Sequence, residues 1–112
     1  MNLTKKPAIF GSPRKTEVLK LLALLEESYP REISRLLDAP LLSIQKIVEA
    51  LEHEGLVSTR LIGRQRRVTL NKRFFGAKPL RELLLKLGEA DAELQSIVSS
   101  LRRRPRPRGS PL

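Results

Sequence analysis

The sequence predicts a mainly helical α+β fold with one small β-hairpin and a long C-terminal helix. Three observations lead to this prediction. Apolar residues recur at helical spacing over three segments of the N-terminal half. Two short segments of alternating β character follow, with Gly63 between them. Leucines then repeat every seven residues from Leu80 to Leu101, a spacing typical of the contact seam between paired helices.

Composition narrows the function classes before any motif is considered. The chain has 112 residues, no Cys and a single His, so it offers no thiolate metal site and no cysteine nucleophile. We therefore expect no enzyme, no cofactor and no metal. Apolar runs stay well short of the ~20 residues of a membrane span, and the N-terminus lacks the apolar core of a secretory signal. We expect a cytoplasmic protein without a membrane partner.

The net charge of +10 is unevenly distributed along the chain. Residues 1–54 sum to zero, whereas residues 55–81 carry eight basic side chains and no acidic one. Residues 82–101 sum to −3, and the last eleven residues add +5. A local excess of this size indicates a polyanion partner, with nucleic acid the first candidate. The alternative interpretation is a solvated surface that only keeps the protein soluble.

The first helix is expected to follow a flexible arm of residues 1–11. Ser12 is a good N-cap, and Pro13 suits the first helical position. Pro30 cannot continue the helix, and it biases Tyr29 toward an extended conformation, which leaves room for a very short strand. One face of this helix is apolar and should be buried: Val18, Leu21, Leu22 and Leu25.

Two further helices follow at close spacing. Residues 31–37 form a helix too short to be stable alone in water, so its apolar side chains must dock on a neighbour. Residues 38–40 form a tight break before a third helix over 41–54, and Gly55 lies where a left-handed C-cap belongs. This succession is typical of a helix-turn-helix. The segments 56–60 and 66–70 then form a β-hairpin, joined by a loop over 61–65.

The stretch REISRLLDAPLLSIQKIVEALEHEGLV, followed by STRLIGRQRRVTLN, resembles the winged helix-turn-helix of ArsR/MarR-type transcriptional regulators. The resemblance covers residues 10–71. In that pattern a short helix, a turn, a recognition helix that ends in an acidic pair and Gly-Leu-Val, and a basic wing follow in this order. It implies a winged domain over residues 12–76 that binds double-stranded DNA, as nucleoid-associated regulators do.

The resemblance also implies which residues contact DNA. Base contacts come mainly from the N-terminal part of the recognition helix, which here supplies Leu42, Ser43, Gln45 and Lys46. Leu41 and Leu42 have an alternative role in packing on the turn. Lys46 is the only basic residue of this helix, so the attraction for phosphates must come from elsewhere. The wing supplies it through Arg60, Arg64, Gln65, Arg66 and Arg67, and the second helix adds Arg31 and Arg35 as further phosphate contacts.

The C-terminal segment 77–104 is expected to form one continuous helix over about residues 79–104, with Phe74 and Phe75 seating it on the domain. A helix of ~26 residues spans about 39 Å at ~1.5 Å per residue, so a partner helix from a second copy is favoured. The dimer interface would comprise Leu80, Leu83, Leu84, Leu87, Leu94, Ile97, Val98 and Leu101. The alternative is that this stripe packs on its own domain.

A basic tail over residues 105–112 is expected to be disordered when free. Arginines of the tail and of the helix end would contact phosphates: Arg102, Arg103, Arg104, Arg106 and Arg108. The sequence thus favours a homodimeric transcription regulator that binds specific double-stranded DNA sequences. A winged helix that binds another protein is the main alternative, and RNA binding is a third.

Overall fold

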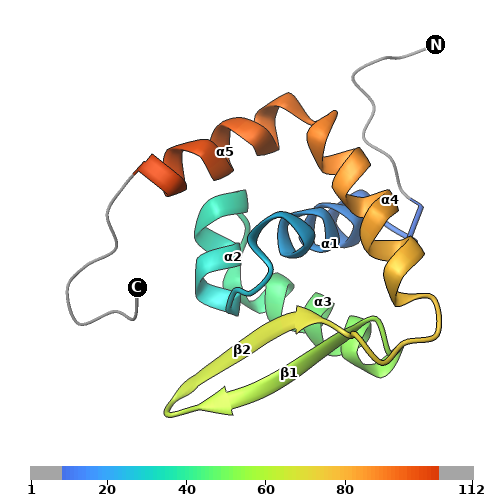
Figure 1. The fold of residues 1–112 in the computed structure, drawn as a ribbon. Coiled ribbons are helices and arrows are strands. Elements are labelled where there is room, and N and C mark those ends of the chain that lie inside the picture. Colours follow the sequence, from blue (N-terminus) through green and yellow to red (C-terminus); the bar gives the residue numbers. More distant parts are fainter. Residues whose placement is uncertain (1–8, 104–112) are drawn as a thin grey trace.

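The computed structural model describes residues 9–103 and has the predicted α+β, winged-helix fold. Five helices and one two-stranded antiparallel sheet are present in this range (Figure 1). The elements are α1 (Pro13–Leu25), α2 (Pro30–Leu37), α3 (Leu41–His53), β1 (Val57–Ile62), β2 (Gln65–Leu70), α4 (Ala77–Glu89) and α5 (Ala92–Arg103). The winged-helix fold class predicted from the sequence is therefore confirmed.

Helix α1 lies at the centre, and the other helices surround it (Figure 1). It begins as predicted, because the Ser12 hydroxyl accepts a hydrogen bond from the Lys15 backbone N–H at 3.1 Å. Its burial is not confined to one face: beside its buried leucines, Thr16, Glu17 and Lys20 are also buried. A helix buried on this scale needs partners for its polar side chains as well as for its apolar ones.

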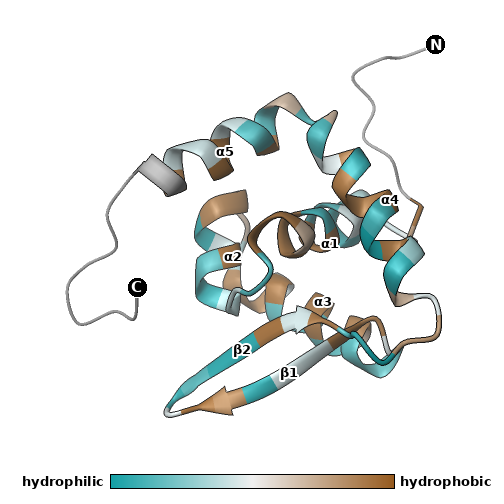
Figure 2. Ribbon diagram, in the orientation of Figure 1, coloured by the Kyte–Doolittle hydropathy of each residue, from teal (hydrophilic) through white to brown (hydrophobic). Residues whose placement is uncertain are grey.

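The helix-turn-helix follows the predicted spacing. Helix α2 ends at Asp38, which adopts a left-handed conformation with φ 52°. Helix α3 buries Ile44, Val48 and Leu51 against the core, and Gly55 follows it with φ 83°, as expected for a C-cap glycine. Coloured by hydropathy, each of these helices carries both apolar and hydrophilic segments (Figure 2).

The β-hairpin is longer and its turn is tighter than the sequence suggested. Strands β1 and β2 pair from Val57 with Leu70 to Ile62 with Gln65, so the predicted loop over 61–65 is reduced to two residues. Gly63, with φ 63°, permits this turn. The predicted short strand also exists as a single bridge, in which Ser28 and Val68 exchange backbone hydrogen bonds of 3.0 and 2.8 Å.

The prediction of one continuous C-terminal helix is wrong, because the chain breaks between α4 and α5. Asp91 sits at the break, and its carboxylate accepts a hydrogen bond from the Leu94 backbone N–H at 3.0 Å, which caps α5. The same carboxylate pairs with the Lys20 ammonium at 2.7 Å. Gln95 adds a 2.9 Å hydrogen bond from its side chain to the Gly88 carbonyl. These contacts turn α5 back over the domain.

The residues of the predicted dimer interface therefore lie partly in the core and partly at the surface of their own chain. Leu84, Leu94 and Val98 are buried in the core of their own chain, so they are not available to a partner helix in this structure. Leu83 remains 42% exposed, while the other four predicted interface residues are partly buried: Leu80, Leu87, Ile97 and Leu101. Phe75 also departs from its expected core position, since it is 97% exposed and contacts Phe74 with ring centroids 4.7 Å apart.

Candidate nucleic-acid interface

The N-terminal part of α3 presents a polar, solvent-facing surface. Ser43, Gln45 and Lys46 are exposed, and Leu42 is 62% exposed. Leu41 is half-buried, so the packing alternative applies to Leu41 and not to Leu42. The four predicted base-reading residues therefore lie together on the outward side of one helix, opposite the side buried in the core. We name them the reading face.

Two acidic residues at the C-terminal end of α3 have specific partners, whereas Glu49, one turn after Gln45 and Lys46, is exposed. The Glu54 carboxylate pairs with the Lys15 ammonium at 2.9 Å. The Glu52 carboxylate accepts a hydrogen bond from the Thr59 hydroxyl of β1 at 2.6 Å. Both contacts lie at the C-terminal end of α3, and they reduce the repulsion that these carboxylates would exert on a phosphate backbone.

The β-hairpin is fixed to α3 by a short chain of polar contacts. The Thr59 hydroxyl donates a hydrogen bond to Glu52 and accepts one from the Arg66 guanidinium at 3.0 Å. The hydroxyl therefore acts both as donor and as acceptor. At the base of the hairpin, the Asn71 side-chain amide donates to the Gly55 carbonyl at 2.8 Å. Neither Thr59 nor Asn71 was a predicted site residue, because their partners lie on other elements.

The predicted wing residues divide into exposed and restrained side chains. Arg60, Arg64 and Arg66 are exposed, and Gln65 is half-buried. Arg67 is also half-buried; its guanidinium pairs with the Glu27 carboxylate at 3.2 Å and lies 5.6 Å from the centroid of the Tyr29 ring. Arg67 therefore ties β2 to the end of α1, and it is less available to a partner than the other wing arginines.

The remaining predicted phosphate contacts are less closely connected to this surface. Arg31 and Arg35 are both exposed on α2, and Arg35 lines a shallow groove with Ile97 and Leu101 of α5. The side chains of Arg102 and Arg103 lie outside the described residues, as do Arg104, Arg106 and Arg108.

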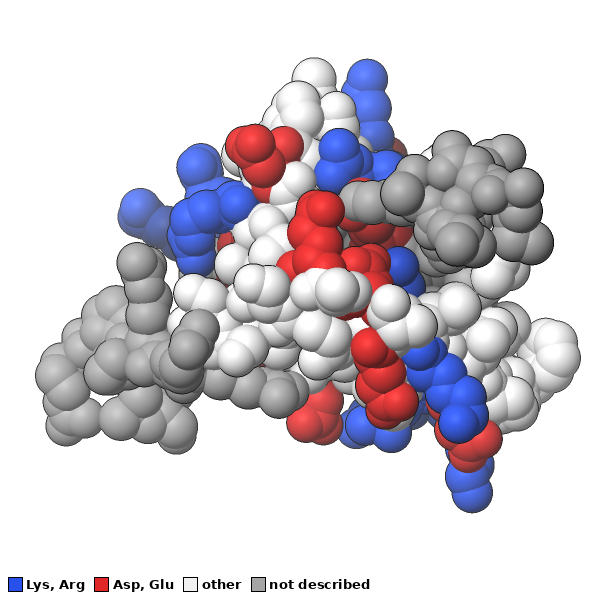
Figure 3. All heavy atoms as spheres, turned by 90° about the horizontal axis from the view of Figure 1, so that it is seen from above, with Lys and Arg blue, Asp and Glu red and all other residues white. Residues whose placement is uncertain are grey.

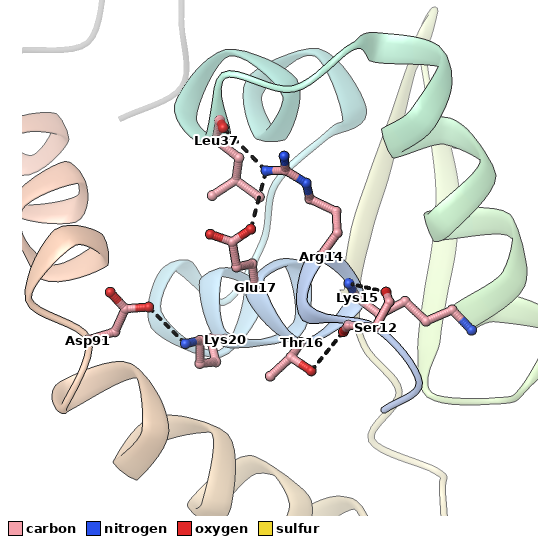
Figure 4. A network of polar contacts seen from close by, with 8 residues as sticks. All are labelled: Ser12, Arg14, Lys15, Thr16, Glu17, Lys20, Leu37 and Asp91. Atoms are coloured by element: carbon pink, nitrogen blue, oxygen red, sulfur yellow. Dashed lines mark hydrogen bonds and ion pairs between the residues drawn. The ribbon is translucent and has the colours of Figure 1, made fainter. Parts of the chain in front are cut away.

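Cations of α1 contrast with those of the wing, because every one has a carboxylate partner. Figure 4 shows the pairs of Arg14 and Lys20. Arg14 pairs with Glu17 at 3.2 Å, and its guanidinium also donates to the Leu37 carbonyl at 3.4 Å. Lys20 points to Asp91 across the α1–α4 packing. In the view from above, acidic side chains gather in the middle of the face while basic ones lie nearer its edges (Figure 3). The paired cations of α1 thus serve the fold.

Other kinds of site find little support in the part of the chain that the structure describes. Residues 9–103 contain no group of three His, Cys, Asp or Glu side chains placed to hold a metal ion. Over the same range, no helix combines the length and the apolar character that a membrane crossing needs.

Comparison with known proteins supports the fold. Neither a family model nor a curated protein matches the sequence. Two solved structures of ZitR from Lactococcus lactis, variants with one and two substitutions, are similar to this chain. The first matches with a TM-score of 0.54 and 16% identity over 91% of this chain and 78% of its own. The second matches with a TM-score of 0.54 and 17% identity over 88% and 81%. At this identity the likeness establishes a common fold alone.

Proposed function

We propose that this protein is a transcription regulator that binds specific double-stranded DNA sequences as a homodimer. The observation that carries the proposal is the exposed reading face of α3 beside exposed wing arginines that have no carboxylate partner within the described residues. A protein with this role would act in the cytoplasm at the nucleoid.

The reading face suits the major groove in size and chemistry. An α-helix fits the major groove, where each base pair presents a distinct pattern of donors and acceptors. The Gln45 amide can form two hydrogen bonds with adenine, and the Lys46 ammonium can bind guanine or a phosphate. Leu42, with its exposed side chain, can contact a thymine methyl group. These three residues would therefore set the sequence preference.

The wing would supply most of the electrostatic attraction. Arg60, Arg64 and Arg66 are exposed near the hairpin turn, and a guanidinium binds phosphate oxygens in a two-pronged geometry. A narrow minor groove attracts arginine in the same way. Since α3 has only one basic residue within its span, Lys46, affinity would depend on the wing and would fall as salt rises.

The dimer would place two reading faces on one duplex. Leu83 is exposed on α4, and Leu80 and Leu87 on the same helix are only partly buried, so α4 has apolar surface for a second copy. Two-fold symmetry would set the recognition helices ~34 Å apart, one turn of B-DNA, over a site that reads as a palindrome.

Selection of bound sequences from random duplex DNA tests the proposal, with the oligomer mass measured by light scattering on the same sample. We expect a palindromic consensus and a dimer mass. The double variant Gln45→Ala/Lys46→Ala should lose the consensus while it retains binding at low salt. His53→Ala, exposed at the far end of the same helix, is the matched control and should leave the consensus unchanged. Absence of duplex binding at low salt, or preference for RNA in direct competition, would contradict the proposed function.

A further inference from the structure

A groove of about 1000 Å³ lies between the hairpin, the end of α1 and the start of α4, and no residue of α3 lines it. Its lining includes six basic side chains from three parts of the chain: Arg60, Arg67, Lys72, Arg73, Lys78 and Arg81. The only acidic residues that line it are Glu26 and Glu27, at the end of α1. We name this feature the basic groove.

Most of the positive charge in the basic groove is not neutralised within the protein. Arg67 pairs with Glu27 and so forms part of the wall. The other five basic side chains are exposed, and none has an ion-pair partner among residues 9–103. Like charges that converge on one concave surface repel one another, and they concentrate anions from solution there.

The start of α4 adds a second, independent sign of an anion site. The N-terminus of a helix carries partial positive charge, so acidic side chains are favoured in the first turn and basic ones are disfavoured. Helix α4 has no acid in its first turn and has Lys78 there instead, with Arg81 one position beyond that turn. Gly76, at the N-cap, offers no side-chain acceptor. Because Ala77 donates to the Phe74 carbonyl at 2.9 Å and Pro79 has no N–H, only the backbone N–H of Lys78 is left without a protein acceptor in the described residues of this turn. This arrangement costs helix stability unless an anion compensates it.

The basic groove is separate from the reading face. Arg60 and Arg67 are cross-strand partners, and side chains alternate between the two faces of a hairpin. The Thr59 hydroxyl, at the intervening position, contacts Glu52 of α3, although Thr59 also belongs to the lining of the groove. None of the four reading-face residues lines the basic groove, so the groove would face a different stretch of anion from the one that α3 reads.

We propose that the basic groove binds a run of adjacent phosphate groups. Small-molecule pockets enclose most of their ligand's surface, whereas five of the six cations of this groove are exposed to solvent. Such a surface fits a phosphate chain that passes through it. We expect these phosphates to belong to the nucleic-acid backbone beyond the segment that α3 reads. This assignment rests on the proposed function, whereas the binding of phosphate groups as such does not depend on it.

Titration of the full-length protein with inorganic tripolyphosphate, followed by the NMR shifts of backbone amides, tests the phosphate site without DNA. We expect saturable shifts confined to the amides of residues 58–60, 67–73 and 76–81, and binding at least tenfold tighter than that of monophosphate at equal ionic strength. Lys78→Gln/Arg81→Gln should abolish these shifts. Lys15→Gln/Lys86→Gln changes the net charge equally, outside the groove, and should retain them. Shifts spread over the whole surface, or unchanged in the groove variant, would overturn the proposal.

A second arm identifies the source of the phosphates. The selected DNA site is used as a short duplex and as one with about 20 flanking base pairs on each side. If the backbone is the source, the groove variant should lower the salt slope for the long duplex by about two and leave the short duplex unchanged. If tripolyphosphate binds the groove but both duplexes bind the variant normally, the ligand is a free polyphosphate. If no duplex binds while tripolyphosphate does, the proposed function fails and the phosphate site stands.

Discussion

Helix α1 and the stretch from β1 to the start of α4 both contain Lys and Arg, but these cations differ in whether a carboxylate pairs with them. In α1, the three cations Arg14, Lys15 and Lys20 each pair with a carboxylate, at 3.2, 2.9 and 2.7 Å. From Arg60 to Arg81, only Arg67 has such a partner among the described residues. The role of a cation here therefore depends on whether the fold places an acid next to it.

Burial explains why Lys20, the most deeply buried of the α1 cations, needs its partner. The Lys20 side chain is 3% exposed, and the Asp91 side chain is 14% exposed. An ammonium at that depth is strongly destabilising when it lacks a counter-charge. Apart from Arg67, the cations of the wing and of α4 are exposed, so they can remain unpaired until a polyanion binds.

The largest effect is expected from breaking the Lys20–Asp91 pair. Asp91→Asn keeps a side chain that can cap α5 but removes the charge, so Lys20 is left buried without a counter-charge. We expect the free energy of unfolding to fall by about 3–5 kcal/mol, measured by urea denaturation.

A matched pair and a double variant sharpen this test. Glu54→Gln breaks the more exposed pair with Lys15 and should cost less than about 1 kcal/mol. Lys20→Met/Asp91→Asn removes both charges and should recover most of the stability. Equal losses of unfolding free energy for Asp91→Asn and Glu54→Gln would show that the burial of Lys20 does not make its ion pair more important than that of Lys15.

A smaller effect is expected within the hairpin, where Arg60 and Arg67 are cross-strand partners with different surroundings. Arg67→Ala removes the contact with the Glu27 carboxylate and the contact with the Tyr29 ring. We expect a loss of about 1 kcal/mol in unfolding free energy. Arg60→Ala should stay within about 0.5 kcal/mol of the wild type. A larger loss for Arg60→Ala would reverse the roles assigned to the two arginines.

The smallest effect has the opposite sign. Lys78→Glu places an acid in the first turn of α4, where the helix dipole favours it, and should raise the unfolding free energy by about 0.3–1 kcal/mol. Tripolyphosphate binding should be lost in the same variant. Lys86→Glu, in the last turn of α4, is the control and should be destabilising by a similar amount. A loss of stability in Lys78→Glu would indicate that the first-turn lysine serves the fold.

The N-terminal two-thirds of the fold were predictable because their signals are local. Ser12 caps α1, Pro30 begins α2 and Gly55 ends α3, each through a preference that acts within a few residues. The reading face followed from the same periodicity, since the residues between the buried positions of α3 must face outward. Leu42 and Gln45 are exposed for this reason.

The C-terminal third depended on contacts that local patterns do not contain. A seven-residue leucine repeat fits a continuous paired helix and also two shorter helices folded over their own domain. The deciding contact joins Lys20 to Asp91, which are 71 positions apart. The difference between Arg60 and Arg67 likewise depends on Glu27, a residue of another element. The basic run was visible in the sequence, but its convergence on one groove was not.

The salt dependence of duplex DNA binding tests most directly whether the wing cations bind phosphates while the cations of α1 do not. The logarithm of the association constant is measured against the logarithm of the salt concentration for the wild type and two double variants of equal charge change. Arg60→Ala/Arg64→Ala should reduce the slope by about two, since each phosphate contact contributes about 0.9. Arg14→Ala/Lys15→Ala should leave it unchanged, because both side chains already have carboxylate partners. Equal slopes for both variants, or a larger change for the α1 variant, would contradict the assignment of phosphate binding to the wing.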